Sequence, residues 1–486
     1  MIKKILKIWI LSVLIGGQLF AHSGKPKFHL IIDTDGALDD MRSLSMFLSG
    51  EDIRVLAITC SQGTLMPESV YVKVESLLAD FHSEGIPVGI GKMTGQELPA
   101  WSSFAQGIQW GNVPDKPIAT VGEDANAVLN KSTDYYRDKI TLIALGSLKT
   151  YADWITANPN VIEKIDKIVW YNNHDIDNGF NYKASSESYE IIRASGIKLE
   201  IVGNTSSNYA IDNAYMDLLR NLNSKYARQI VNVHEQTEII DRMKQNHLQL
   251  WDDLVPLYMT DSLLFESETT DNIRLVRLKS DMQKPFIYKY VGQLLESSEN
   301  AENRVFKNFP IDTALYRPEY AKILKETIAN FGSDEWRVIS MTNEIHGHTG
   351  IYSIVGAKMG IRAMEYFNVG VNNMTVKTFA GNQPPLSCLN DGIQISTGAT
   401  IGQGLISVSD TILKIPTAIF EFNNQEIIIS LKKEIAEQMQ QDIRHGVQTY
   451  GPLTDKYWLY VEELAIKYWR DFSRFDIWDI SPLTDK

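Results

Sequence analysis

Four aspartates, Asp33, Asp35, Asp39 and Asp40, lie within eight residues of the sequence, in the segment IIDTDGALDD. Strand side chains alternate between faces, so Asp33 and Asp35 at the end of an apolar run point the same way. Asp39 and Asp40 open a helical pattern that Gly50 ends. Crowded carboxylates raise one another's pKa unless a cation neutralises them, and they select hard ions such as Ca²⁺ or Mg²⁺. The segment predicts a metal site, with a helix cap at Asp39 beside solvated turn residues as the alternative.

The segments around this cluster alternate between predicted strands and predicted helices. The predicted strands are Phe28 to Asp33, Ile53 to Thr59, Pro87 to Ile90, Ile140 to Leu145, Lys167 to Trp170 and Leu199 to Val202. This alternation indicates the α/β class, with a mostly parallel sheet flanked by helices. Ligands bind outside the carboxyl ends of such strands, which is where the aspartates lie.

The length of 486 residues predicts two domains, because a single core stops growing well below that size. We expect the first domain at residues 28–332 and a smaller α+β domain at residues 333–486, since the sequence becomes rich in small and turn-forming residues after Gly332. The net charge of -13 is spread without a long acidic block. It argues against a nucleic-acid partner, and a small-molecule substrate is expected instead.

Residues 1–21 are typical of a secretion signal, with a basic start, the apolar stretch Ile8 to Phe20 and a cleavage point after Ala21. The mature protein is therefore expected in the periplasm or outside the cell. No later segment approaches the length of a membrane span, so no stable membrane anchor is expected. The two cysteines, Cys60 and Cys388, do not indicate a disulfide framework.

Five segments, in order, match a known pattern. They are DTDGALDD, ITCSQGT (Ile58 to Thr64), TLIALGSL (Thr141 to Leu148), NGFNYKASSES (Asn178 to Ser188) and WDDLVPLYMTDSLLF (Trp251 to Phe265). Their order and types resemble the nucleoside hydrolases, the inosine-uridine preferring family. The resemblance implies hydrolysis of the N-glycosidic bond of a ribonucleoside by a homo-oligomeric enzyme that uses Ca²⁺.

The resemblance also implies roles for individual residues. The implied calcium ligands are Asp35, Asp40, the backbone carbonyl of Leu145 and Asp252. Asp35 is then also the general base for a metal-bound water. The residues implied to bind sugar hydroxyls are Asp39, Asn173 and Asn181. Carboxylates suit this reaction because its transition state is a sugar cation attacked by water on one face.

Two departures from the family pattern concern the sugar. Thr64 stands in place of an asparagine, and Gly179 stands in place of a glutamate, so two potential sugar contacts are absent. The alternative to an enzyme is therefore a non-catalytic nucleoside- or sugar-binding protein with a metal-binding second domain.

The position before the last aspartate is Trp251, where many family members have a histidine. An aromatic residue here resembles the purine-preferring branch, in which it stacks on the base. Trp101 or Trp110 is a candidate for the opposite wall. The alternative is that Trp251 belongs to the core, because tryptophan is often largely buried.

A second enzyme class shares the first motif. IIDTDGALDD also resembles the opening of a haloacid dehalogenase-type phosphatase, with Asp33 as nucleophile and Asp35 as acid and base. That class needs an ordered series of a Ser or Thr, a Lys and a further acid, and no convincing series follows. We therefore favour the hydrolase.

The second domain resembles a small domain family of formylmethanofuran dehydrogenase, through EIHGHTGIYSIVGAKMGIRAME and SCLNDGIQISTGATIGQGLIS. His346 and His348 are two apart, which on an extended stretch places both imidazoles on one side. Cys388 and Asp391 would join them around Zn²⁺ or another transition metal. Ala399 replaces a family cysteine, and the alternative of turn-capping histidines with a buried Cys388 stays open.

Overall fold

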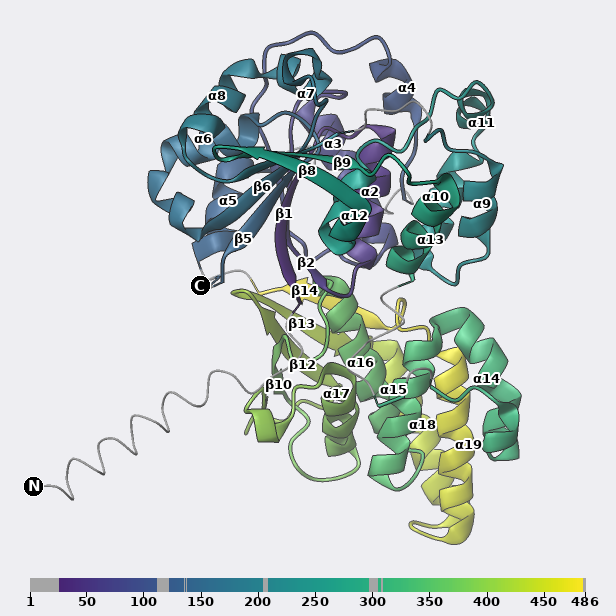
Figure 1. Ribbon diagram of the computed structural model, residues 1–486. Coiled ribbons are helices and arrows are strands. Elements are labelled where there is room, and N and C mark those ends of the chain that lie inside the picture. Colours follow the sequence, from purple (N-terminus) through teal and green to yellow (C-terminus); the bar gives the residue numbers. More distant parts are fainter. Residues whose placement is uncertain are drawn as a thin grey trace, which may run out of the picture.

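The computed structural model describes residues 26–111, 122–134, 136, 138–203, 209–296, 305–306 and 309–483. They form two units, each with its own sheet and hydrophobic core, one above the other in Figure 1. The predicted signal segment, residues 1–21, lies outside the described residues. Among the residues described, no helix has the length and apolar character needed to cross a membrane.

The N-terminal unit is built on a nine-stranded sheet in the order β4-β3-β2-β1-β5-β6-β7-β9-β8. Neighbouring strands run parallel except β8 and β9. The strands are β1 (Phe28–Thr34), β2 (Ile53–Cys60), β3 (Val88–Ile90), β4 (Glu123–Asp124), β5 (Ile140–Ala144), β6 (Ile165–Tyr171), β7 (Leu199–Val202), β8 (Phe265–Thr270) and β9 (Ile273–Leu278). All six predicted strands are present, with ends that differ by at most two residues. The predicted α/β fold with a mostly parallel sheet is confirmed.

Helices cover both faces of this sheet, so that neighbouring residues of one strand enter different cores. Leu30 and Ile32 of β1 point into one core, and Ile31 points into the other. The helices on the first face are α2 (Leu38–Ser49), α3 (Pro67–Asp80), α9 (Asn213–Arg220), α10 (Lys225–His234), α11 (Thr237–Lys244), α12 (Leu254–Thr260) and α13 (Lys284–Leu295). Those on the second face are α5 (Ala125–Asp134), α6 (Lys149–Ala157) and α8 (Ser186–Ala194). This covering explains why every residue of β2 is buried.

The strand order reverses between β1 and β5. The chain runs from β1 outward through β2 and β3 to β4, then returns to β5 and runs outward through β6 and β7 on the other side. The loops that leave β1 and β5 therefore turn away from each other and open a crevice at the carboxyl ends. Asp33 pairs with Ala144 at this end, so the aspartate segment lies at the switch point. The short helices α4 (Ser102–Gly107) and α7 (Phe180–Ala184) also belong to connections that follow strand ends.

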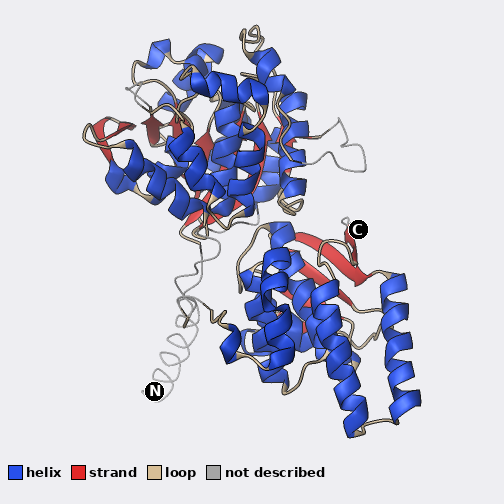
Figure 2. Cartoon of the chain, turned by 90° about the vertical axis from the view of Figure 1, so that its right-hand side faces the viewer, coloured by secondary structure: helices blue, strands red, loops and turns tan. Residues whose placement is uncertain are grey.

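The C-terminal unit combines a five-stranded sheet, β11-β10-β12-β13-β14, with a group of helices. The strands are β10 (Thr375–Thr378), β11 (Ile406–Val408), β12 (Thr417–Phe422), β13 (Gln425–Leu431) and β14 (Trp478–Pro482). The helices are α14 (Pro318–Phe331), α15 (Ser333–His346), α16 (Ile351–Phe367), α17 (Leu389–Thr397), α18 (Lys433–Tyr450) and α19 (Asp455–Asp471). Figure 2 shows the helices packed as a layer beside this sheet, which agrees with the expected α+β character.

The position expected for the domain boundary, 332/333, falls between α14 and α15. Ile323 and Leu324 of α14 pack in the same core as Trp336 of α15, so the structure groups α14 with the C-terminal unit. Within this unit α16 and α17 pack closely, because a Cβ on Gly356 would lie 2.1 Å from the carbonyl oxygen of Leu389.

The two units contact each other at the amino ends of the first sheet. The Gly85 amide, just before β3, donates to the Tyr366 carbonyl at 2.8 Å. The Arg362 guanidinium of α16 pairs with Glu84 at 2.9 Å and donates to the His82 carbonyl. The carboxyl-end crevice lies at the opposite edge of the sheet, which leaves it uncovered by the C-terminal unit (Figure 1).

Candidate active site

Three carboxylates from distant parts of the chain meet at the switch point. One carboxylate oxygen each of Asp39, Asp40 and Asp252 lies within 4.8 Å of the other two. Asp39 and Asp40 are in the first turn of α2, and Asp252 lies just before α12. No other group of three His, Cys, Asp or Glu ligand atoms comes so close together in the part of the chain that the structure describes.

The bonding within this group leaves oxygens free for a cation. Asp40 Oδ1 accepts hydrogen bonds from Thr34 Oγ1 at 2.7 Å and from the Asp35 amide at 3.0 Å, which fixes the carboxylate. Asp252 Oδ1 is buried without a hydrogen-bond partner among the described residues. Burial, and then the charges of neighbouring aspartates, raise the pKa of Asp40 and of Asp252 well above the ordinary value. A hard divalent cation fits this donor set, because it would supply the missing partner and the missing positive charge.

Asp35 lies beside this group but is not one of its three members. Its Oδ1 accepts the Ala37 amide at 3.3 Å, and the backbone at Gly63 packs so closely that a Cβ there would lie 2.1 Å from Asp35 Oδ2. Burial raises the pKa of Asp35 to about 7, with a further contribution from the charge of Asp39. A carboxyl group with this pKa exchanges protons readily near neutral pH, as a general base must.

The predicted ligand Leu145 and the predicted sugar contact Asn181 contact each other. Asn181 is buried, and its Nδ2 donates to the Leu145 carbonyl at 2.7 Å and to the Tyr171 carbonyl at 3.0 Å. The carbonyl keeps a second lone pair, whereas both amide hydrogens of Asn181 are used to join the ends of β5 and β6. Asn173 is exposed, and Asp39 is half-buried at the edge of the carboxylate group.

Two residues that the sequence analysis did not single out hold the two halves of the site together. Arg42 of α2 donates from Nε to Asp253 Oδ1 at 2.8 Å and from Nη2 to Asp253 Oδ2 at 2.7 Å. Both side chains are almost completely buried. Each follows a predicted ligand, Asp40 or Asp252, and the second acid of the WDDL motif was the available signal.

Exposed aromatic side chains surround the site. Trp251 is 37% exposed, so it is not a core residue, and Trp101 and Phe180 lie with their ring centroids 5.1 Å apart. Trp110 is buried and is therefore not available as a wall. Phe180 was not predicted as a site residue, although it lies within the NGFNY motif. These rings are suited to hold a planar, uncharged group.

The four residues predicted as ligands in the C-terminal unit do not form a comparable group. His346 Nδ1 and Asp391 Oδ2 lie 2.8 Å apart, and the rings of His346 and His348 have centroids 4.4 Å apart. Cys388, half-buried, does not bring a third ligand atom within 4.8 Å of that pair. The extended stretch expected at His346 is wrong, because α15 continues to His346 and ends at Gly347, whose φ of 79° is left-handed.

The fold and the buried carboxylates define an α/β protein with a cation-type site at the switch point of a parallel sheet. Residues 30–304 match the model of the inosine-uridine preferring nucleoside hydrolase family, which covers more than half of the chain. The chain therefore belongs to this family. Residues 345–465 match the model of FmdE, described as molybdenum formylmethanofuran dehydrogenase operon. Both resemblances are confirmed, and the match is to the hydrolases rather than to the phosphatases that share the DTDG run.

Individual relatives are more distant. The pyrimidine-specific ribonucleoside hydrolases RihA of Salmonella paratyphi A and Salmonella dublin are each 26% identical over 184 residues, which is 36% of this chain and 59% of theirs. The chain thus spans less than two thirds of the length of these curated relatives. Among solved structures, the purine-preferring ribonucleoside hydrolase from Gardnerella vaginalis has 17% identity and a TM-score of 0.46 over 55% of this chain and 99% of that chain. The plant nucleoside hydrolase PpNRh1 has 18% identity and a TM-score of 0.45 over 56% and 100%.

Proposed function

We propose that the N-terminal unit hydrolyses the N-glycosidic bond of a ribonucleoside, with Ca²⁺ held by Asp35, Asp40, Asp252 and the Leu145 carbonyl. The observation that carries the proposal is the meeting of Asp39, Asp40 and Asp252 at the carboxyl edge of the sheet in a member of this family. The unpartnered oxygen of Asp252 supports a cation there, since a buried charge is costly unless it is paired.

The ion, when bound, would lower the pKa of a coordinated water and orient it. Asp35 accepts the proton of the attacking water, for which its pKa of about 7 is suited. Asp39, half-buried at the edge of the group, binds a sugar hydroxyl and holds the ring beside the water. The surrounding carboxylates stabilise the positive charge that develops on the sugar as the bond to the base breaks.

A purine base is the proposed leaving group. Trp251 lies next to Asp252 in the chain and is exposed, and the Trp101 and Phe180 pair offers a further aromatic surface. A purine presents a larger face for stacking than a pyrimidine. The curated relatives are pyrimidine-specific, so the comparison of inosine with uridine decides this point. We further propose that the mature protein is secreted or periplasmic and forms a homo-oligomer.

The proposal is tested with the full-length protein, without its signal segment, incubated with Ca²⁺ and inosine, adenosine, guanosine or uridine. Release of ribose, measured as reducing sugar, is expected to be fastest with a purine nucleoside. Asp35→Ala should abolish the release while the thermal unfolding midpoint stays near that of the wild type. Release from none of the four nucleosides, or unchanged release by Asp35→Ala, contradicts the proposal.

A non-catalytic binding protein is the second candidate. It is favoured by the missing sugar contacts at Thr64 and Gly179 and by the use of both Asn181 amide hydrogens on backbone carbonyls. Calorimetric titration with the same nucleosides separates the two candidates. A nucleoside that binds in the presence of Ca²⁺ but stays intact for hours identifies a binding protein.

A further inference from the structure

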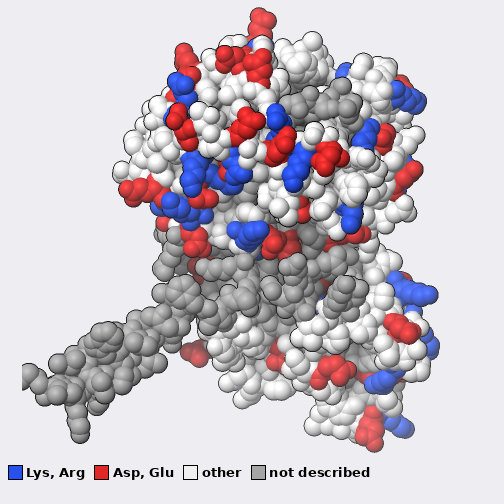
Figure 3. All heavy atoms as spheres, viewed as in Figure 1, with Lys and Arg blue, Asp and Glu red and all other residues white. Residues whose placement is uncertain are grey.

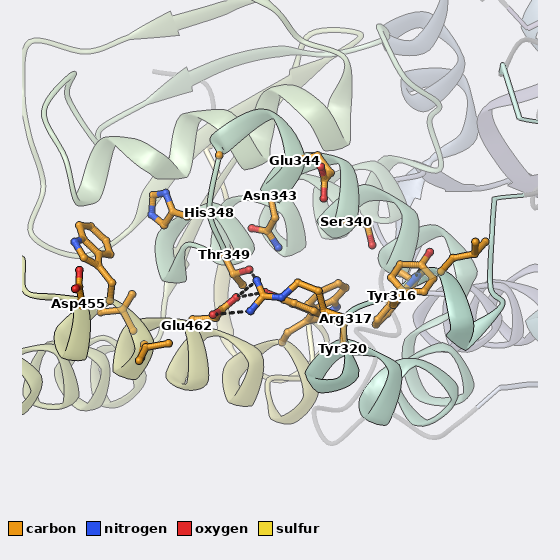
Figure 4. Close-up of a pocket in the computed structure, with 17 residues that line it drawn as sticks. Tyr316, Arg317, Tyr320, Ser340, Asn343, Glu344, His348, Thr349, Asp455 and Glu462 are labelled. Atoms are coloured by element: carbon orange, nitrogen blue, oxygen red, sulfur yellow. Dashed lines mark hydrogen bonds and ion pairs between the residues drawn. The ribbon is translucent and has the colours of Figure 1, made fainter.

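The C-terminal unit contains a cavity of about 860 Å³, remote from the carboxylate site. It is bounded by α14, α15 and α19, and Figure 4 shows side chains from all three helices around it. Its size is within the range of small-molecule sites, roughly 300 to 1,000 Å³. The predicted aromatic face of the last helix contributes to this cavity, since Trp458 is 42% exposed beside it while Trp469 is buried.

Three polar atoms that line the cavity are buried and unpartnered in the described part of the chain. They are Ser340 Oγ, Asn343 Nδ2 and Trp469 Nε1. The orientation of the Asn343 amide is determined by its other end, because Oδ1 accepts hydrogen bonds from the Gly350 amide and from Ser353 Oγ. Asn343 thus presents N–H donors, and Figure 4 shows Ser340 and Asn343 extending from α15 into the space above Arg317 and Tyr320.

These atoms indicate what the cavity would bind. A buried donor without a partner costs about 1 to 3 kcal/mol, and a ligand with acceptor atoms would remove that cost. Trp469 offers only an N–H and Asn343 offers its amide hydrogens, so the complementary groups are carbonyl oxygens or ring nitrogens.

The walls of the cavity are largely aromatic. The rings that line it are Tyr316, Tyr320, Trp336, Trp458 and Trp469. Trp336 and Trp469 are stacked with centroids 4.4 Å apart and form a rigid base to the cavity. Flat aromatic side chains favour a flat ligand, because rings gain from stacked and edge-to-face contacts beyond the area that they bury.

The charges around the cavity exclude anions. Its carboxylates are Glu344, Asp455 and Glu462, whereas its one guanidinium, Arg317, is already bound to Glu462 by hydrogen bonds of 2.8 and 3.1 Å. Burial lowers the pKa of His348, so its ring is neutral at pH 7. A phosphate or carboxylate ligand would therefore meet net negative charge without an available cation.

We propose that this cavity is a second ligand site, which binds an uncharged, planar nitrogen heterocycle of the nucleobase class through Asn343, Ser340 and Trp469. The site is distinct from the carboxylate cluster, and its proposed ligand does not need to be hydrolysed there. Trp458, at the exposed side of the cavity, covers the outer face of the bound ring.

The experiment is a titration of the full-length protein with adenine, hypoxanthine and uracil, followed by calorimetry and by tryptophan fluorescence. Free bases have no glycosidic bond, so the result does not depend on the proposed hydrolysis. At least one base is expected to bind, and Asn343→Asp should weaken that binding at least tenfold. This substitution keeps the acceptor for Gly350 and Ser353 and exchanges only the N–H donors for a carboxylate oxygen.

The matched control is Gln448→Glu, which makes the same amide-to-carboxylate change at an exposed position of α18 outside the cavity. It should bind the base as the wild type does. Trp458→Ala provides an independent test, because loss of an exposed ring leaves the core intact and should still weaken binding. The proposal is overturned if no base binds to the wild type, if both cavity variants bind like Gln448→Glu, or if adenosine monophosphate binds more tightly than adenine.

Discussion

Arg42 and Asp253 are 211 positions apart in the sequence and form a buried, bidentate ion pair with donor-acceptor distances of 2.8 and 2.7 Å. Arg42 is one turn along the helix that begins with Asp39 and Asp40, and Asp253 follows Asp252 directly. The pair therefore fixes the distance between the two chain segments that contribute carboxylates to the site. Figure 3 shows charged residues of both signs intermixed on the surface of the N-terminal unit, whereas this pair lies inside.

Substitution of Arg42 by Met is expected to destabilise the protein by about 3 to 5 kcal/mol, because it leaves the Asp253 carboxylate buried without its partner. Asp253→Asn should cost less than Arg42→Met, since a neutral amide remains. Urea unfolding of each variant and of the double variant measures the coupling between the two positions. Additive losses would show that the two side chains do not stabilise each other.

The carboxylate group predicts opposite effects of Ca²⁺ on two variants. Without Ca²⁺, Asp252→Asn should unfold at or above the wild-type temperature, because it removes a buried carboxyl group that lacks a partner. With Ca²⁺ at about 100 times its dissociation constant, the wild type should gain about 2.7 kcal/mol while Asp252→Asn gains little. Differential scanning calorimetry with EDTA and with Ca²⁺ measures both states.

Asp166→Asn is the control for this comparison, since Asp166 is exposed near the amino end of β6 and remote from the cluster. It should respond to Ca²⁺ as the wild type does. An equal stabilisation of Asp252→Asn and Asp166→Asn by Ca²⁺ would remove Asp252 from the metal site.

The position of Asp35 depends on the absence of a side chain at Gly63. A Cβ at Gly63 would lie 2.1 Å from Asp35 Oδ2, so Gly63→Ala must displace the proposed base. A displacement of about 1 Å is expected to lower kcat about 100-fold. Gly107→Ala is the control, because a Cβ there meets nothing within 4 Å. Nucleoside hydrolysis by the two variants, at saturating substrate, should differ by this factor, and equal rates would show that Asp35 need not be held in this position.

The sequence contained enough information for the fold of the N-terminal unit because its strands are continuously apolar, as in IRVLAITC of β2. It was not sufficient for the β8 and β9 hairpin, since β8 reads FESETT and only Phe265 of that strand is buried. The grouping of Asp40 with Asp252 was predicted through the resemblance to a family, because no local pattern reports a contact between segments so far apart in the chain. The distances, the involvement of Arg42 and the bonding of Asn181 to Leu145 depend on packing that only the structure shows.

The same difference separates the two histidine positions from what they form. HGH was predicted as an extended metal-binding stretch, yet Gly347 ends α15 between the two histidines. Helix or strand cannot be chosen from three residues, and here the helical pattern of the preceding residues extends further than expected. The cavity beside His348 had no signal in the sequence, because its lining comes from three helices that are far apart in the chain.

The contact between the two units should weaken in mild acid because of His82. This ring is stacked on Phe475 of the C-terminal unit at a centroid distance of 3.9 Å, and burial lowers the pKa of His82 to about 4. Its pKa in the unfolded chain is about 6.5, so between pH 6.5 and 4 the unfolded state binds more protons than the folded state. Stability is therefore complete above pH 6.5 and falls as the pH is lowered toward 4.

His82→Asn removes this dependence and suits the backbone, because the φ of His82 is 55° and asparagine tolerates that conformation. Thermal unfolding midpoints between pH 7.5 and 4.5 should fall less steeply for His82→Asn than for the wild type. His445→Gln, at an exposed histidine of α18, should keep the wild-type slope. Parallel curves for the wild type and His82→Asn would show that His82 is not the group that couples protons to the contact between the units.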